Sequence, residues 1–161
     1  MILVGKVPGP REPDDLDSFL HPLIEELKQL EDGILTWNAH LKKEIILRAH
    51  LIVVTADMKA REKLMRHTGN GSSRYCTYCM AHGIWNGKVY APLSIPKDAP
   101  ISAKQRGKWR NLDPLKLPMR KNDQWKRDAT RITMQMDWKL SKDTGIAWLS
   151  TFCQLKSIDF P

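Results

Sequence analysis

Five consecutive residues, Leu51 to Thr55, form an apolar and largely β-branched run that is followed by Ala56 and Asp57. A strand that is covered on both faces need not alternate apolar with polar residues, so this run predicts a buried strand. In open α/β sheets the carboxyl ends of the strands carry the chemistry, and Asp57 stands at that position. The run therefore predicts an α/β fold with a carboxylate at the end of a strand.

The residues before this run predict two helices. From Leu16 to Leu30 the apolar residues recur every three or four positions, which is the pattern of an amphipathic helix. Asp14 and Asp15 can cap its beginning, and Gly33 can end it. Residues 38–49 are predicted as a second, shorter helix that leads into the strand.

The residues after Asp57 are less regular. A helix-like stretch runs from Ala60 to His67, and residues 84–121 contain five prolines, which predict an irregular segment. A third helix is predicted from a cap at Asp123 to an end at Gly145. Its apolar face would be formed by Trp125, Ala129, Ile132, Met136 and Leu140.

The charge of the chain is unevenly distributed. Of its 161 residues 26 are Lys or Arg and 18 are Asp or Glu, which gives a formal net charge of +8. Residues 1–35 carry a charge of −5, so the remaining 126 residues carry +13. Because phosphate neutralisation dominates non-specific nucleic-acid binding, such a body suits DNA as a partner. The alternative is a soluble basic protein without a nucleic-acid partner.

The most basic stretch lies between Lys104 and Arg131, where ten basic and three acidic residues are interleaved with Trp109 and Trp125. Such a segment could follow a nucleic-acid backbone while its indoles stack on bases. The alternative is a solvated loop whose tryptophans belong to the core, and for Trp125, which lies on a helical apolar face, the core is favoured. The predicted DNA-contacting cations are Lys104, Arg106, Lys108, Arg110, Arg120, Lys121, Lys126 and Arg127.

Cys76 and Cys79 form a C-x-x-C motif, which is half of a tetrahedral zinc site. A complete site needs two more ligands. His82, His67 and Cys153 are candidates, although none of them gives a recognised second half. The alternatives are a pair of unliganded thiols and a redox dithiol, and the lack of a helical stripe after the first cysteine argues against the dithiol. Zn²⁺ is therefore the predicted ligand.

Asp57 has two interpretations. Phosphoryl-transfer nucleases hold two Mg²⁺ ions with clustered acids on strand ends, and Asp57 could supply one of these carboxylates. One carboxylate cannot build such a site. Asp57 also precedes a helix-like stretch, where Asp is a preferred N-cap residue. The local sequence alone favours the cap.

Several classes of protein are disfavoured. Three cysteines do not make a disulfide framework, no run approaches the roughly 18 apolar residues of a membrane span, and the apolar start at residues 1–5 is too short for a signal-peptide core. We therefore expect an intracellular location and no membrane partner. The chain contains no Gly-rich phosphate loop and no nucleophile elbow, so no small-molecule substrate is expected.

Five stretches, in this order, resemble fungal relatives of the CACTA (En/Spm) transposases. They are Val4–Pro13, the helix to Leu30, Thr55–Met58, Arg74–Cys79 and Ser157–Pro161. The similarity spans nearly the full length, which makes it far more specific than the C-x-x-C motif alone. The resemblance implies an RNase H-like core that cuts and pastes DNA with three acids and Mg²⁺, and hence a nuclear location.

On the family pattern Asp57 matches the second acid, at the end of the fourth strand, and Cys76 and Cys79 match the paired cysteines of a zinc-binding insertion. The resemblance thus favours a former catalytic position for Asp57. The first acid, an Asp-x-x-His motif and the final acid have no counterpart in these 161 residues. We therefore expect an internal, catalytically incomplete fragment.

The resemblance divides the chain into three parts. Residues 1–57 are expected to form a partial RNase H-like core of strand, helix, helix and strand, ending at Asp57. Residues 58–144 are expected to be an irregular, partly helical insertion with the zinc knuckle and the basic segment, and residues 145–161 to begin the return to the core. The expected function is that of a transposase-derived fragment. The alternative is a co-opted nucleic-acid-binding module that uses residues 104–131.

Overall fold

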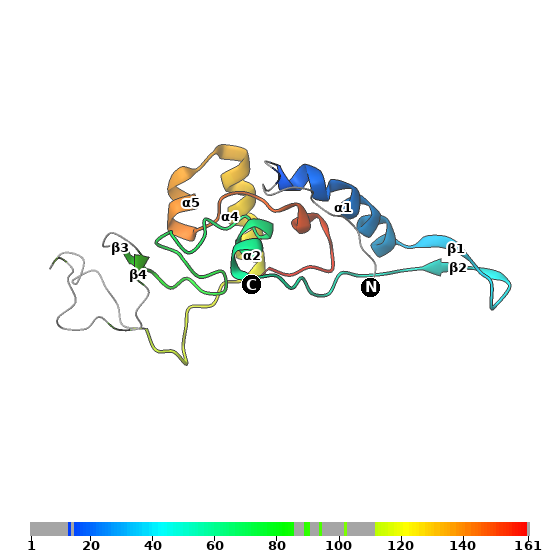
Figure 1. Cartoon of the computed structure of the whole chain (residues 1–161), viewed down its shortest axis with the longest axis horizontal. Helices are drawn as coiled ribbons and strands as arrows, with labels where there is room; N and C mark the ends of the chain where they lie inside the picture. The colour runs from blue at the N-terminus through cyan, green and yellow to red at the C-terminus, as the bar shows by residue number, and fades with distance from the viewer. Residues whose placement is uncertain are drawn as a thin grey trace. The chain divides into compact units, whose positions relative to one another are not determined.

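The computed structural model describes residues 13, 15–85, 89–90, 94, 102 and 112–160. It divides the chain into two compact units. Figure 1 labels the helices and strands along the chain. Unit 1 comprises Met1–Thr55 and Ser150–Asp159, and unit 2 comprises Ala56–Leu149 and Phe160–Pro161. The charge divides along the same boundary. Unit 1 has seven basic and ten acidic residues, a net charge of −3, whereas unit 2 has nineteen basic and eight acidic residues, a net charge of +11.

Helix α1 (Leu16–Asp32) confirms the predicted amphipathic helix. Its N-cap is Asp15, whose carboxylate accepts a hydrogen bond from the backbone N–H of Asp17 at 3.0 Å. Pro22 lies inside the helix without ending it. Gly33 ends it with φ +102°, a backbone conformation that a glycine adopts without steric cost, and donates its N–H to the Gln29 carbonyl.

The core of unit 1 forms where α1 packs against a short 3₁₀ helix, η1 (Thr151–Gln154). The Thr151 hydroxyl donates to the Asp17 carboxylate of α1 at 3.2 Å. The buried apolar side chains of this core, none of them more than 7 % exposed, are Ile24, Phe152, Leu155 and Ile158. Three of these four residues, Phe152, Leu155 and Ile158, lie in η1 or just after it.

The prediction of a second helix over residues 38–49 is wrong. Strands β1 (Ile34–Asn38) and β2 (Lys43–Leu47) form an antiparallel hairpin there, in a register that pairs Ile34 with Leu47 and Asn38 with Lys43. The β-branched residues of this segment favour extended backbone over helix.

The turn of the hairpin is made by residues 39–42. The Asn38 side chain accepts a hydrogen bond from the backbone N–H of Leu41 at 2.9 Å, and Lys42 takes φ +48°. Asparagine favours such turns because its short side chain can bond its own backbone a few residues on. The turn is not predicted from the sequence because residues 39–42 contain neither glycine nor proline.

The prediction of a strand over Leu51–Thr55 is also wrong. Residues 51–57 carry no ladder of hydrogen bonds, and the side chains of Ile52 and Val53 are 83 % and 66 % exposed. A strand exists only beside a hydrogen-bonded neighbour, and none of the described residues pairs with this run. Asp57 therefore does not lie at the end of a strand.

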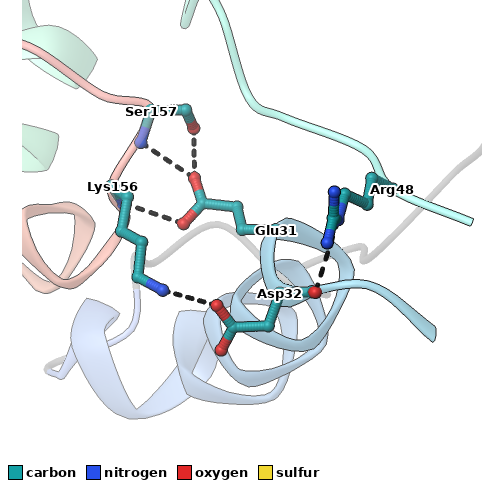
Figure 2. A network of polar contacts seen from close by, with 5 residues as sticks. All are labelled: Glu31, Asp32, Arg48, Lys156 and Ser157. Atoms are coloured by element: carbon teal, nitrogen blue, oxygen red, sulfur yellow. Dashed lines mark hydrogen bonds and ion pairs between the residues drawn. The ribbon is translucent and has the colours of Figure 1, made fainter. Parts of the chain in front are cut away.

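A hydrogen-bonded network fastens the last residues of unit 1 to the end of α1 (Figure 2). The Glu31 carboxylate, which is buried, accepts the backbone N–H groups of Lys156 and Ser157 at 2.8 and 2.9 Å and also the Ser157 hydroxyl. The neighbouring Asp32 carboxylate pairs with the Lys156 ammonium group. The Asp32 carbonyl accepts a hydrogen bond from the Arg48 guanidinium at 3.4 Å.

Unit 2 contains helix α2 (Met58–Leu64), an antiparallel pair of two-residue strands, β3 (Ile84–Trp85) and β4 (Val89–Tyr90), and helices α4 (Asn122–Gln135) and α5 (Trp138–Thr144). Its buried apolar side chains are Met65, Cys79, Ala81, Ile84, Trp125, Ala129, Ile132, Ile146 and Phe160. The described chain therefore mixes helices with small antiparallel sheets, in agreement with the predicted α/β class.

The helix predicted from Asp123 to Gly145 is present but broken in two. Met136 takes a left-handed conformation, φ +50°, which ends α4, and Asp137 caps α5 by accepting the N–H of Leu140 at 2.9 Å. Leu140 therefore belongs to α5 and not to the apolar face of α4. Gly145 ends α5, as predicted, with φ +76°. Asp123 is not the cap of α4, since Lys121 occupies the N-cap position without a side-chain cap bond.

None of the helices in the described part of the chain is long and apolar enough to cross a membrane.

Candidate functional site

Asp57 is the N-cap residue of α2. Its exposed carboxylate accepts a hydrogen bond from the backbone N–H of Ala60 at 2.7 Å. The cap interpretation is thus confirmed, and the catalytic interpretation stays a prediction. Among residues 13–160, in the parts that the structure describes, no three His, Cys, Asp or Glu side chains lie close enough together to hold a metal ion.

Cys76 and Cys79 lie on a tight turn in which the Tyr78 backbone N–H donates to the Cys76 sulfur at 3.4 Å. Burial raises the pKa of the Cys76 thiol. Hydrogen bonds from the N–H groups of Tyr78 and Cys79 and from the Cys79 thiol, together with the positive charge of Arg120, outweigh burial and hold that pKa below its ordinary value. The pKa of Cys79 is raised by burial and by the neighbouring Cys76. The turn therefore stabilises one thiolate of the pair.

The segment before α4 holds this turn from the other side. Backbone hydrogen bonds link Met80 to the Pro118 carbonyl at 2.8 Å and Arg120 to the Tyr78 carbonyl at 2.9 Å, around a bridge between Cys79 and Met119. Residues 40 positions apart are thus paired as short antiparallel segments. The C-x-x-C turn is therefore supported by tertiary structure and is not an isolated loop.

Arg120 connects this turn to the helices. Its Nε and Nη2 donate to the Cys76 carbonyl at 3.1 and 3.0 Å, its Nη1 donates to the Thr144 carbonyl at 2.7 Å, and its guanidinium lies 5.0 Å from the centre of the Trp125 ring. Burial lowers the pKa of Arg120 to about 10, and the group remains charged at neutral pH. These contacts give Arg120 a structural role. The contact of Arg120 with DNA stays a prediction.

His67 packs beside Arg120 and Trp125. Its ring stacks on Trp125 with centroids 6.0 Å apart, its Nδ1 accepts the Gly69 N–H at 3.0 Å, and its Nε2 lies 3.3 Å from an Arg120 nitrogen. Burial, reinforced by Arg120, lowers the pKa of His67 to about 4, so the ring is neutral at pH 7. Within the described ranges neither His67 nor His82 completes a group of three metal ligands with the two cysteines.

Helix α4 has one buried face and one basic face. Trp125, Ala129 and Ile132 are 0–3 % exposed and pack into unit 2, and the Trp125 ring stacks with the rings of His67 and Phe160. The other side of the helix carries an open depression, which we call the α4 basic face. It is lined by Lys126, Arg127, Thr130, Arg131, Met134 and Gln135.

The predicted DNA-contacting residues divide into three groups. Lys126 and Arg127 lie on the α4 basic face, and Lys121 is exposed at the beginning of the helix. Arg120 is half-buried in the unit and bonded to the Cys76 and Thr144 carbonyls. The remaining four, Lys104, Arg106, Lys108 and Arg110, lie outside the described residues.

Two exposed tryptophans beside α4 are not among the residues predicted from the sequence to contact DNA. Trp125 is 2 % exposed, as the predicted core position requires, and Trp109 lies outside the described residues. Trp138 and Trp148 are 66 % and 45 % exposed. The sequence gives only a weak signal of their exposure. Neither tryptophan falls on the apolar stripe of α4, and a tryptophan outside such a stripe is not expected in the core.

The comparisons with known proteins give one match. The model of the family described as "Transposase family tnp2" matches residues 1–89, more than half of the chain, a span that includes Asp57 and both cysteines of the C-x-x-C turn. No curated protein and no solved structure matches the chain. The resemblance to CACTA-type transposases drawn from five separate stretches is thereby confirmed at the level of the family. The chain belongs to the transposase family tnp2.

Proposed function

We propose that this transposase-derived chain binds DNA through unit 2 and does not cut DNA on its own. The observation that carries the proposal is the α4 basic face, where Lys126, Arg127 and Arg131 surround an open depression on a helix whose opposite side is buried. A rigidly packed helix that presents cations to solvent offers phosphates a fixed set of partners. The net charge of +11 on unit 2 attracts the same polyanion from a distance.

DNA cleavage needs a different arrangement of residues from DNA binding. Two-metal hydrolysis requires carboxylates clustered so that both Mg²⁺ ions bind between them. Asp57 is the residue that the resemblance assigns to catalysis, and in this structure its carboxylate accepts a helix N–H. The RNase H-like core of the family would also need the Leu51–Thr55 run to pair with another strand. We propose that the chain acts in the nucleus.

The DNA proposal is tested by a fluorescence-anisotropy titration of the purified chain with a labelled duplex of about 20 base pairs at several salt concentrations. The affinity should fall steeply as salt rises from about 50 to about 200 mM. The double variant Lys126→Gln/Arg127→Gln should weaken binding and lower the slope of log Kd against log salt by about 2.

The matched control is Lys42→Gln/Lys43→Gln. It removes the same charge from two exposed lysines at the turn of the β1–β2 hairpin in unit 1. This variant should leave the affinity and the salt slope unchanged. Absence of binding at low salt, or an equal loss in both double variants, would contradict the proposal.

The cleavage proposal is tested by incubating the same chain with supercoiled plasmid and either Mg²⁺ or Mn²⁺. No nicked product should accumulate. Divalent-ion-dependent nicking that disappears in Asp57→Ala would show that the chain is a complete nuclease and that this part of the proposal is wrong.

A second proposal concerns zinc at Cys76 and Cys79. It is supported by the tight turn, which brings two thiols together and stabilises one of them as the thiolate, the form that binds metals. Among the described residues, Cys76 and Cys79 supply two of the four ligands of a tetrahedral zinc site, and no third ligand lies near them. Metal analysis of protein produced with Zn²⁺ should give about one equivalent, and Cys76→Ser/Cys79→Ser should abolish it. Zinc retained by that double variant would exclude the two cysteines as ligands.

A further inference from the structure

We infer that Trp138 and Trp148 stack on unpaired bases at the edges of the α4 basic face, so that this surface binds single-stranded DNA in preference to duplex. This inference rests on the proposed DNA-binding function and specifies the form of DNA that the surface takes. It is carried by the exposure of the two indoles and by the hydrogen bonds that fix their backbones beside α4.

Trp138 is placed by Arg131. The Arg131 guanidinium on the α4 basic face pairs with the Asp137 carboxylate at 3.0 Å, and Asp137 is the N-cap residue of α5. Trp138 is the first residue of α5, directly after that cap, and its N–H donates to the Met136 carbonyl at 2.9 Å. The indole, 66 % exposed, therefore stands on backbone held against the Arg131 side of the basic face.

Trp148 is placed by Thr133. The Thr133 hydroxyl of α4 accepts the backbone N–H of Leu149 at 2.8 Å, and on the other side of Trp148 the N–H of Ala147 donates to the Arg66 carbonyl at 2.7 Å. The backbone is thus fixed on both sides of an indole that is 45 % exposed.

Arg131 and Thr133, which hold the backbones near the two tryptophans, lie at opposite edges of the exposed surface of α4. With about 100° between successive residues of an α-helix, Arg131 and Thr133 project to either side of Met134, which is 78 % exposed on the basic face. One tryptophan is therefore anchored on each side of the cations. This arrangement is the one expected of a single-strand groove, in which cations follow the phosphates and indoles stack on successive bases.

Single-stranded DNA is favoured over duplex because an indole can stack only on a base whose face is accessible. In a duplex the faces of the bases are covered by their stacked neighbours, so an exposed indole has nothing to stack on unless a base is unpaired. Lys126 and Arg127 serve both forms because both carry phosphates. A protein partner is disfavoured because the exposed apolar side chains are interrupted by lysine and arginine, whereas the cores of protein interfaces are depleted of charged residues and especially of lysine.

The experiment compares oligonucleotides and tryptophan variants by fluorescence anisotropy at one salt concentration. The probes are a labelled oligo-dT of about 20 nucleotides, a duplex of the same length and an oligo-rU of the same length. The wild-type chain should bind oligo-dT most tightly. Trp138→Ala and Trp148→Ala should each weaken oligo-dT binding by about 5- to 100-fold and leave duplex binding within about twofold.

Two controls separate stacking from damage to the fold. Trp85→Ala removes an indole that is 61 % exposed on β3, elsewhere in unit 2, and should change neither affinity. Trp138→Phe keeps an aromatic face and should retain most of the oligo-dT affinity. Far-UV circular dichroism should be the same for all variants, since each replaced side chain is exposed.

The outcomes distinguish this inference from the proposed function. If Lys126→Gln/Arg127→Gln weakens duplex binding but Trp138→Ala and Trp148→Ala leave oligo-dT binding unchanged, the DNA surface is correct and the stacking inference is wrong. Tighter binding of oligo-rU than of oligo-dT, or a change of oligomeric state in the tryptophan variants on size-exclusion chromatography, would also overturn it. If no variant affects any probe, the proposed function itself fails.

Discussion

The carboxylate of Glu31, at the end of α1, accepts the backbone N–H of Ser157 at 2.9 Å across 126 positions of the chain (Figure 2). The same carboxylate takes the N–H of Lys156 and the hydroxyl of Ser157, so three donors meet on one buried acid. A carboxylate can satisfy backbone donors that would otherwise be buried without a partner. This one residue therefore joins the first helix of unit 1 to its last segment.

The first prediction concerns the stability that Glu31 provides. Glu31→Ala should lower the free energy of unfolding of unit 1 by about 2–4 kcal/mol, because charge-assisted hydrogen bonds are lost and buried N–H groups are left unpaired. Glu26→Ala, on the exposed side of the same helix, should change it by less than about 0.5 kcal/mol. Urea denaturation followed by circular dichroism measures both. Equal midpoints for the two variants would show that the network contributes nothing.

The second prediction concerns pH. Burial by itself raises the pKa of the Glu31 carboxyl, but the hydrogen bonds from Ser157 and from the Lys156 and Ser157 backbone outweigh it, so this pKa lies below its ordinary value of 4.5. A carboxyl whose pKa is lower in the folded state stabilises the fold above its unfolded pKa and loses that contribution as pH falls through the folded value. Urea midpoints should therefore drop below about pH 4.5 in the wild type and vary less in Glu31→Gln. Parallel pH profiles would refute the assignment.

The third prediction concerns Arg120. Arg120→Lys should destabilise unit 2 by about 1–3 kcal/mol, because one ammonium group cannot donate to the Cys76 and Thr144 carbonyls at the same time as the planar guanidinium does. Arg127→Lys, an exposed position on α4, should be nearly neutral. Thermal unfolding of the two variants tests the difference. A neutral Arg120→Lys would mean that the Arg120 contacts are dispensable.

The fourth prediction concerns Gly145, which ends α5 with φ +76°. A Cβ atom at this position would lie 2.7 Å from the Arg74 Cβ and 2.8 Å from the Arg74 carbonyl oxygen, in addition to the strain of a left-handed conformation. Gly145→Ala should therefore lower stability by about 2 kcal/mol or more. Gly71→Ala is the control, since a Cβ there would meet nothing within 4 Å. Differential scanning calorimetry should show a lower Tm for the first variant alone.

The local sequence was sufficient wherever a structure is stabilised by residues close to it along the chain. The stripe from Leu16 to Leu30 predicted α1, Asp57 predicted the beginning of α2, and Gly145 predicted the end of α5. Trp125 was assigned to the core from its place on a helical face, and it is 2 % exposed. Helical periodicity and capping are visible from the sequence because both act within a few residues.

The tertiary structure decided the features that depend on distant partners. Leu51–Thr55 has the composition of a strand but forms none, because none of the described residues supplies the hydrogen-bonded neighbour that a strand requires. Residues 38–49 fold as part of a hairpin with β1, where the helix prediction considered one segment alone.

The candidate site shows the same division. The sequence indicated the Lys126 and Arg127 cations and the C-x-x-C motif, since residue type and spacing are local properties. It could not show that Arg120 is committed to the carbonyls of Cys76 and Thr144, or that Trp138 and Trp148 remain exposed beside the α4 basic face. Burial and hydrogen-bond partners are set by segments tens of residues away, and only the folded chain brings those segments together.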